Sequence, residues 1–283
     1  MSGDTRQIED QPIGIQARKK WLIVAICVLA VGSVIIANLS FVAGLFDEDT
    51  DINFDDYKTV IGKTTENSFG KLTLNEVMVD DNQLLLNATF DPEESMDFDH
   101  QIFFFPQLHI NGKDLTVRNR GQSVEQHESK YTIYSSIQVS ELPQNEKLTL
   151  DISYNKWNLE KPIDQPWDFQ VEVSQKQILA DKKIFSINEA IPLTNGNEVT
   201  VTKVVSTPIS TTIYYYLAKS PSETVDFKIK SASGESWRWD SGYMLDDEVV
   251  NRFDALYLTD DIYYLIPIAT DDKALGPSIQ IGK

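Results

Sequence analysis

The sequence predicts one N-terminal transmembrane α-helix followed by an all-β ectodomain of two tandem antiparallel β-sandwiches. Three observations favour this class: a single long apolar segment near the start, strand-like alternation of apolar and polar residues beyond it, and turn residues between the alternating runs. The chain has 283 residues, 41% of them hydrophobic, which is enough to bury a core. This length is typical of one or two domains.

The charge balance and the single cysteine exclude several classes of protein. The chain has 43 acidic and 25 basic residues, a formal net charge of −18. Proteins bind nucleic acid by neutralising its phosphates with Lys and Arg, so we expect no nucleic-acid partner. Cys27 alone can form neither an intrachain disulfide nor a multi-cysteine metal site.

Residues 21–46 form the predicted transmembrane helix. No charged residue lies between Trp21 and Phe46. As a helix this segment would reach roughly 39 Å, more than the hydrocarbon core of about 30 Å. The alternative is a cleaved secretory signal, but the apolar part of such a signal usually has only about 7–15 residues. We therefore expect an uncleaved anchor in the lipid bilayer.

The flanking charges predict the orientation of this anchor. Arg18, Lys19 and Lys20 precede it, and acidic residues follow it. Because basic residues stay on the cytoplasmic side, residues 1–20 are expected to be a cytoplasmic tail and the C-terminal region extracytoplasmic. The predicted location is the cell membrane, with residues 47–66 as an acidic juxtamembrane linker.

Period-two patterns beyond the linker predict half-buried antiparallel strands. Leu148, Leu150 and Ile152 alternate with polar residues, and residues 167–173 and 225–230 do the same. The Asn111-Gly112 pair between two apolar runs is a strong hairpin signal. Short strands separated by turns favour immunoglobulin-like (Ig-like) sandwiches. Only residues 246–253 suggest a short helix.

A weak internal repeat predicts where the two sandwiches meet. Residues 72–79 and 199–206 share one pattern at an offset of 127 residues, and each is followed by a polar turn and an apolar strand. The alternative is that any two amphipathic strands look alike. The offset is close to the size of one sandwich domain, so we predict domains at 67–182 and 183–283.

Three stretches carry a resemblance to known proteins. GKLTLNEVMVDDNQLLLNATF (70–90), PWDFQVEV (166–173) and INEAIPLTNGNEVTVTKVVSTPISTTIYYYLA (187–218) resemble the paired ectodomain families of Gram-positive bacterial single-pass membrane proteins, which are catalogued as domains of unknown function. The resemblance covers about residues 57–283. It implies Ig-like domains, and some members are related to anti-sigma factors. Members that regulate sigma factors usually have a folded cytoplasmic domain, often with a zinc-binding His and two Cys, whereas the tail here contains neither residue type.

No motif in the chain predicts catalysis. There is no Gly-x-Ser-x-Gly elbow and no phosphate-binding glycine loop. The histidines at 100, 109 and 127 lack metal-ligand spacing, and the acidic run after residue 46 has Ile52 where a calcium loop needs Gly. Adjacent aspartates such as Asp80-Asp81 are interpreted as solvated turn charges. We expect no catalytic, cofactor-binding or metal site, no cofactor, and no enzyme.

Clustered aromatic residues are the predicted binding surface. Consecutive rings on a strand must alternate between its two faces, so one ring of each cluster points away from its own core. An outward ring can anchor a protein partner. It can also stack on a sugar ring, or it can pack between the two sandwiches, which is the favoured interpretation of the two. The candidate partner-binding aromatics are Phe104, Tyr215, Trp237, Trp239 and Tyr263.

Together these features favour a membrane protein whose extracytoplasmic β-sandwiches bind or sense a cell-surface ligand or partner without catalysis. The partner would be a membrane or cell-envelope protein. One alternative is a reduced anti-sigma-factor-like regulator that signals across the membrane through its 20-residue tail. Another is an extracytoplasmic hydrolase, whose site would assemble from residues distant in the sequence.

Overall fold

The computed structural model describes residues 44–46, 54–93, 104–157, 161–217 and 225–282. The predicted tail and residues 21–43 of the predicted membrane segment lie outside these ranges. Within them, no helix combines the length and apolar character needed to cross a bilayer. Residues 44–46, at the end of the predicted segment, are helical.

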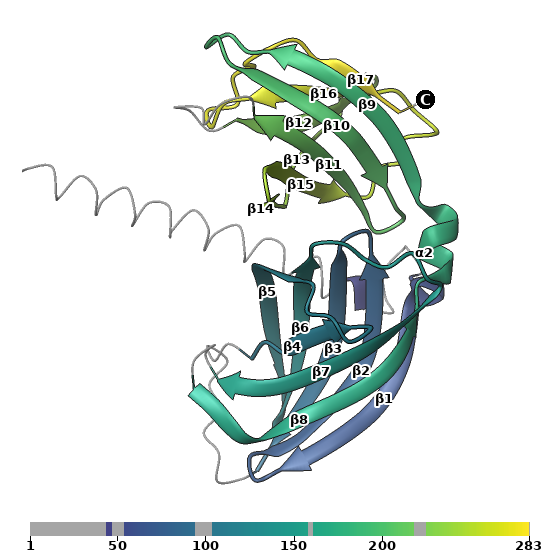
Figure 1. The fold of residues 1–283 in the computed structure, drawn as a ribbon, viewed down its shortest axis with the longest axis vertical. Coiled ribbons are helices and arrows are strands. Elements are labelled where there is room, and N and C mark those ends of the chain that lie inside the picture. The colour runs from purple at the N-terminus through teal and green to yellow at the C-terminus, as the bar shows by residue number, and fades with distance from the viewer. Residues whose placement is uncertain (1–43, 47–53, 94–103, 158–160, 218–224, 283) are drawn as a thin grey trace, which may run out of the picture.

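The described chain has an all-β fold of antiparallel sheets with few helices, arranged as two halves (Figure 1). The N-terminal half contains η1 (Asp55–Tyr57), β1 (Lys58–Asn67), β2 (Gly70–Asp80), β3 (Gln83–Pro92), β4 (Gln107–Ile110), β5 (Thr116–His127), β6 (Lys130–Val139), β7 (Lys147–Trp157) and β8 (Lys161–Ser174). The helix α2 (Lys176–Asp181) leads to the C-terminal half. This half contains β9 (Lys183–Pro192), β10 (Glu198–Ser206), β11 (Ser210–Leu217), β12 (Asp226–Ser231), β13 (Ser236–Arg238), β14 (Ser241–Leu245), β15 (Glu248–Asp254), β16 (Tyr263–Ile268) and β17 (Ile279–Ile281).

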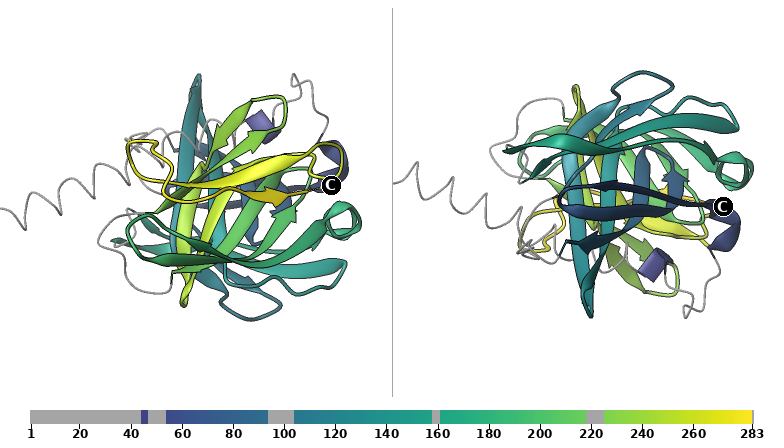
Figure 2. Two further views of the ribbon diagram at one scale, coloured as in Figure 1. Left: turned by 90° about the horizontal axis from the view of Figure 1, so that it is seen from above. Right: turned by 90° about the horizontal axis from the view of Figure 1, so that it is seen from below.

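The two halves share one strand order. The N-terminal half has a five-stranded sheet, β1-β2-β3-β6-β5, and a three-stranded sheet, β4-β7-β8. The C-terminal half has the corresponding five-stranded sheet, β9-β10-β11-β15-β14, and a four-stranded sheet, β13-β12-β16-β17. Views from above and below show sheets layered against each other in each half (Figure 2).

A shared irregularity supports the internal repeat. The β2–β3 pairing shifts register between Leu74 and Glu76, and the β10–β11 pairing shifts between Val201 and Lys203. These positions differ by the same 127 residues as the sequence pattern. A bulge inserts an extra residue and bends the strand, so two unrelated strands would rarely place it at matching positions.

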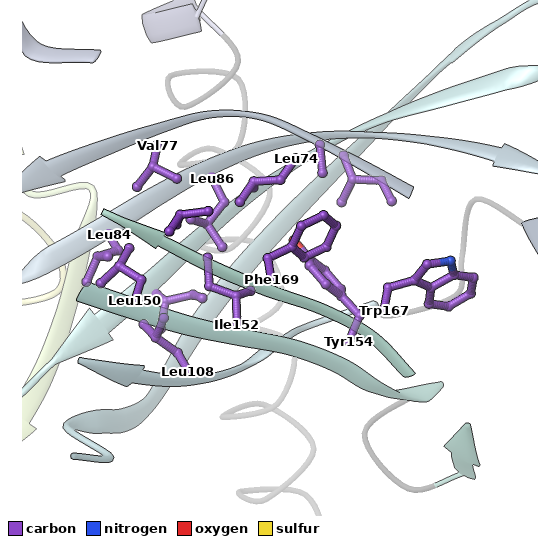
Figure 3. Packing of buried hydrophobic residues seen from close by; sticks show 14 of the residues in the cluster. Leu74, Val77, Leu84, Leu86, Leu108, Leu150, Ile152, Tyr154, Trp167 and Phe169 are labelled. Atoms are coloured by element: carbon purple, nitrogen blue, oxygen red, sulfur yellow. The ribbon is translucent and has the colours of Figure 1, made fainter. Parts of the chain in front are cut away.

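The N-terminal core consists of apolar residues from both sheets (Figure 3). In β7 and β8, buried and exposed residues alternate as the sequence predicts. Trp167 is fully buried, and its ring centroid lies 5.4 Å from that of Phe90 and 5.3 Å from that of Phe104. The Trp167 Nε1–H donates a hydrogen bond of 3.0 Å to the carbonyl oxygen of Gly70, which satisfies the one polar atom of the indole.

The C-terminal half has a separate core, which includes Val199, Ile213, Phe227, Phe253 and Leu265. All five side chains are fully buried. The two cores contain no residue in common, so each half buries its own apolar surface.

The structure corrects two predictions about local structure. Residues 58–66 were expected to be part of a linker, but they lie in β1, which pairs with β2 from Lys58 to Asn67. The sequence did not predict this strand because the acidic residues before it made the whole segment resemble a linker. Residues 246–253 are no helix: Asp246 has a φ of +54° in a turn, and β15 follows. Val250 and Phe253 lie in different buried clusters. Both faces of β15 are therefore buried, as expected for a central strand of a sheet.

Replacing Gly70 with alanine is expected to destabilise the N-terminal half by about 3 kcal/mol. Gly70 has a φ of +139°, and a Cβ there would overlap the carbonyl oxygen of Asp91. Gly196 is the matched control, since its φ is +80° but its Cβ would meet nothing within 4 Å. Gly196→Ala should cost about 1 kcal/mol. Chemical denaturation measures both, and equal losses would contradict the steric account.

Candidate functional site

The predicted partner-binding aromatics lie mostly inside the cores. Phe104 is fully buried, Tyr215 is 2% exposed and Tyr263 is 8% exposed. Trp237 and Trp239 are half-buried and pack against the C-terminal core, and the Trp237 ring lies 5.8 Å from that of Tyr263. The three buried rings therefore cannot serve as outward anchors for a partner, and that prediction is wrong for them.

Consecutive rings do alternate between the two faces of a strand, but the outward rings are not the predicted ones. Tyr215 faces the core, so its neighbours Tyr214 and Tyr216 lie on the other face of β11. Tyr216 is 43% exposed, and Tyr264, next to the buried Tyr263, is 36% exposed. Tyr214 is buried at the junction of the two halves, as the packing interpretation of the aromatic clusters anticipated.

The junction begins where two equivalent hairpins meet turn to turn. The β2–β3 turn presents Asp80, and the β10–β11 turn presents Thr207, its counterpart in the repeat. Thr207 Oγ1 donates a hydrogen bond of 2.7 Å to Asp80 Oδ1, and Ser210 Oγ donates one of 2.6 Å to Asp80 Oδ2. Asp80 is fully buried, so its carboxylate depends on these partners from the other half.

Arg252 on β15 supplies the opposite charge. Its Nη1 forms an ion pair with Asp80 and donates a hydrogen bond of 2.6 Å to Ser210, while its Nη2 donates to Asn82. Arg252 is 2% exposed. Burial alone would lower the pKa of Arg252, but the Asp80 carboxylate opposes this and the net direction is upward. We call Asp80, Asn82, Ser210 and Arg252 the junction cluster.

Tyrosines and a lysine surround the junction cluster. Tyr214 donates a hydrogen bond of 2.5 Å to Asp81, and Asn82 donates to both Tyr214 and Tyr243. Lys182, just after α2, forms an ion pair of 2.6 Å with Asp81. Burial raises the pKa of Tyr214 well above its ordinary value, and Asp81 adds to the shift, so this hydroxyl stays protonated as a donor.

An apolar cluster beside these polar contacts includes the end of the predicted membrane segment. Leu45 is 1% exposed and Phe46 is 7% exposed. The Phe46 ring stacks on Tyr134 of β6 at 6.0 Å, and Lys58 Nζ lies 6.0 Å from the Phe46 centroid. We call this apolar cluster the seat. Its other buried members are the N-cap residue of η1, residues from both halves and one residue of α2: Phe54, Met78, Leu85, Ile178 and Ile209.

A pair of carboxyl groups lies next to the junction cluster. Asp254 ends β15 and pairs with Ser210, and the Asp240 backbone N–H donates to the carbonyl oxygen of Arg252. Burial, the charge of Asp254 and a hydrogen bond between the two carboxyl groups together raise the pKa of Asp240 to about 7. At neutral pH the Asp240 carboxyl is therefore protonated part of the time.

This pair predicts a loss of stability as the pH rises. A carboxyl whose pKa is higher in the folded chain than in the unfolded chain stabilises the fold below its unfolded pKa of about 4, and the contribution disappears towards pH 7. We expect wild type to lose on the order of 2 kcal/mol relative to Asp240→Asn between pH 4.5 and 8. Urea denaturation across this range gives the comparison. Parallel curves for the two proteins would contradict it.

The described residues contain no group of three or more His, Cys, Asp or Glu arranged to hold a metal ion. His127 lies 3.6 Å from Glu125 in an exposed pair. His109 lies in β4, opposite Asp151, and His100 lies outside the described residues. Buried polar groups do gather at the junction.

The sequence did not reveal the junction cluster. Asp80 and Asp81 were interpreted as solvated turn charges, but the turn is buried by the other half. Arg252 lies 172 residues from Asp80, in the segment that resembled a helix. The repeat was the available signal, since it aligns Asp80 with Thr207, although a repeat alone does not show that two turns touch.

Comparison with known proteins supports the fold. A conserved domain protein from Bacillus anthracis has a crystal structure similar to this chain, with a TM-score of 0.60 and 16% sequence identity over 81% of this chain and 90% of that one. The N-terminal periplasmic domain of ScsB from Proteus mirabilis gives a TM-score of only 0.22 at 9% identity, over 80% of this chain and 99% of that one, which is too low to indicate a shared fold. No protein-family profile and no curated protein matches the chain. At 16% identity the first similarity concerns the fold alone.

Proposed function

We propose that the chain is a single-pass membrane protein whose two Ig-like β-sandwiches bind or sense a cell-surface ligand or partner without catalysis. In this proposal residues 21–43 span the bilayer, residues 1–20 are cytoplasmic, and the β region is extracytoplasmic. Leu45 and Phe46, the last residues of the predicted segment, pack against the β region instead of lying in lipid. The apolar segment and its flanking charges support this topology. The two halves with one strand order support tandem domains, with the first extended to include β1.

The seat is the observation that carries the proposal. Leu45 and Phe46, the last residues of the predicted anchor, pack at the junction where the two halves meet. A partner that binds either half and shifts the junction would therefore alter the surroundings of the anchor. This coupling suits a sensor better than a passive tether, whose linker would keep the β region independent of the membrane.

The junction favours binding over catalysis. Asp80 and Arg252 are buried and paired with each other and with neighbouring side chains. A catalytic site needs polar groups that converge on an accessible space. The exposed rings of Tyr216 and Tyr264 are better placed to contact a partner.

Site-specific photocrosslinking in native cells tests the proposal. A photoreactive amino acid replaces Tyr216 or Tyr264 in the full chain, with the exposed Thr149 as the matched polar control and Gln7 as a tail position. We expect discrete crosslinks to an envelope or membrane protein from one of the tyrosine positions and none from Thr149. Crosslinks only from Gln7 would contradict the proposal and favour the regulator that acts through its tail.

A further inference from the structure

The seat places the exit of the predicted anchor at the middle of the molecule. Phe46 contacts Tyr134 in the N-terminal half, and its cluster also contains Ile178 of α2 and Ile209 of the C-terminal half. Figure 1 shows the two halves end to end along the long axis, with α2 beside their junction. The predicted anchor therefore leaves the β region at the junction between the two halves, far from either end. We call this middle part of the molecule the waist.

Little chain is available between the bilayer and this waist. A membrane-spanning helix needs about 20 residues, and residues 21–43 provide only a few more than that. A few extended residues reach about 10 Å at roughly 3.3 Å per residue. The headgroup layer on each side is itself about 5–8 Å thick. Gly44 must then lie in this layer or directly above it.

Burial of Leu45 and Phe46 in the seat keeps the waist close to the membrane surface. Leu45 and Phe46 are almost fully removed from solvent, and exposing both side chains would cost about 4 kcal/mol. The acidic residues between 47 and 51 come after the seat in the chain, so they cannot act as a spacer between the bilayer and the waist. The tether to the β region is consequently short and fixed.

We propose that the protein lies along the membrane, with its junction against the lipid headgroups and its two halves extending to either side. This inference rests on the proposed membrane anchor. It makes the headgroup layer a neighbour of the junction cluster and the seat. The far turns, β1–β2 at one end and β9–β10 at the other, are then both remote from the attachment point.

Energy transfer to labelled lipids tests this geometry. The full chain with Cys27→Ala is reconstituted in zwitterionic phosphatidylcholine vesicles that contain a headgroup-labelled acceptor lipid. Single cysteines for the donor dye replace three exposed residues: Ser68 in the β1–β2 turn, Thr194 before the β9–β10 turn, and Lys176 in α2 at the waist. We expect the highest transfer from position 176 and lower transfer from both 68 and 194. A steady gradient from 68 to 194, in either direction, would overturn the inference.

A spacer variant provides the second measurement. Twenty Gly and Ser residues inserted between Ala43 and Gly44 should lower the transfer from position 176 at least twofold, because the waist is released from the surface. Unchanged transfer would also contradict the inference. If the protein does not stay with the vesicles on flotation, the proposed anchor itself fails, whereas retained protein with a steady gradient refutes only the side-on orientation.

Discussion

Replacing Arg252 with alanine is expected to destabilise the protein by about 3–5 kcal/mol, because it leaves Asp80 as a buried charge without its partner. Asp80 is fully buried, and Arg252 also donates to Ser210 and Asn82, so the substitution breaks contacts in both turns. The loss should appear in chemical denaturation. It should also loosen the two halves relative to each other, which small-angle X-ray scattering would detect as a larger radius of gyration.

Two further variants make this prediction specific. Arg238 forms an exposed pair of 3.0 Å with Asp272, so Arg238→Ala should cost less than about 1 kcal/mol. The double variant Asp80→Leu with Arg252→Met removes both charges and should recover much of the lost stability, since apolar residues of similar size often replace a buried pair without loss. If Arg252→Ala costs no more than Arg238→Ala, the two halves are not held together by this pair.

Replacing Trp167 with alanine should have a comparable effect, about 3–5 kcal/mol, through the N-terminal core. The substitution removes a fully buried indole that contacts Phe90 and Phe104 and leaves the Gly70 carbonyl oxygen without its donor. Because β7 and β8 cover the core at this point, the surrounding strands cannot easily collapse into the cavity.

Trp237 provides the control for this prediction. It is half-buried at the edge of the C-terminal core, in the three-residue strand β13. Trp237→Ala should therefore cost about half as much, roughly 2 kcal/mol. Thermal denaturation followed by near-UV circular dichroism measures both variants. Equal losses would mean that the cluster around Trp167 is not the main contributor to the N-terminal core.

The sequence predicted the strands well because their signal is local. In β7, Leu148, Leu150 and Ile152 are buried while Thr149 is exposed, as period-two alternation requires. The positions of β2 and β10 in the repeat also emerged from pattern alone. The sequence did not predict β1, because β1 is an edge strand with an irregular burial pattern and its residues resemble a polar linker.

The junction could not be predicted because its contacts join residues far apart in the chain. Asp80 and Arg252 each look like ordinary surface charges within their own segments. Likewise, alternation shows that Tyr214 and Tyr215 face opposite ways, but it does not show which face is the core. Both answers depend on how the halves meet, which is a property of the tertiary structure.

Membrane topology tests the central claim most directly. The full chain, tagged at both ends, is expressed in Gram-positive cells, which are treated with protease from outside and then extracted at alkaline pH. We predict that the C-terminal tag is lost, while the N-terminal tag is protected and stays in the membrane pellet. A mature protein that begins after residue 46, or an intact protein in the soluble fraction, would contradict the account.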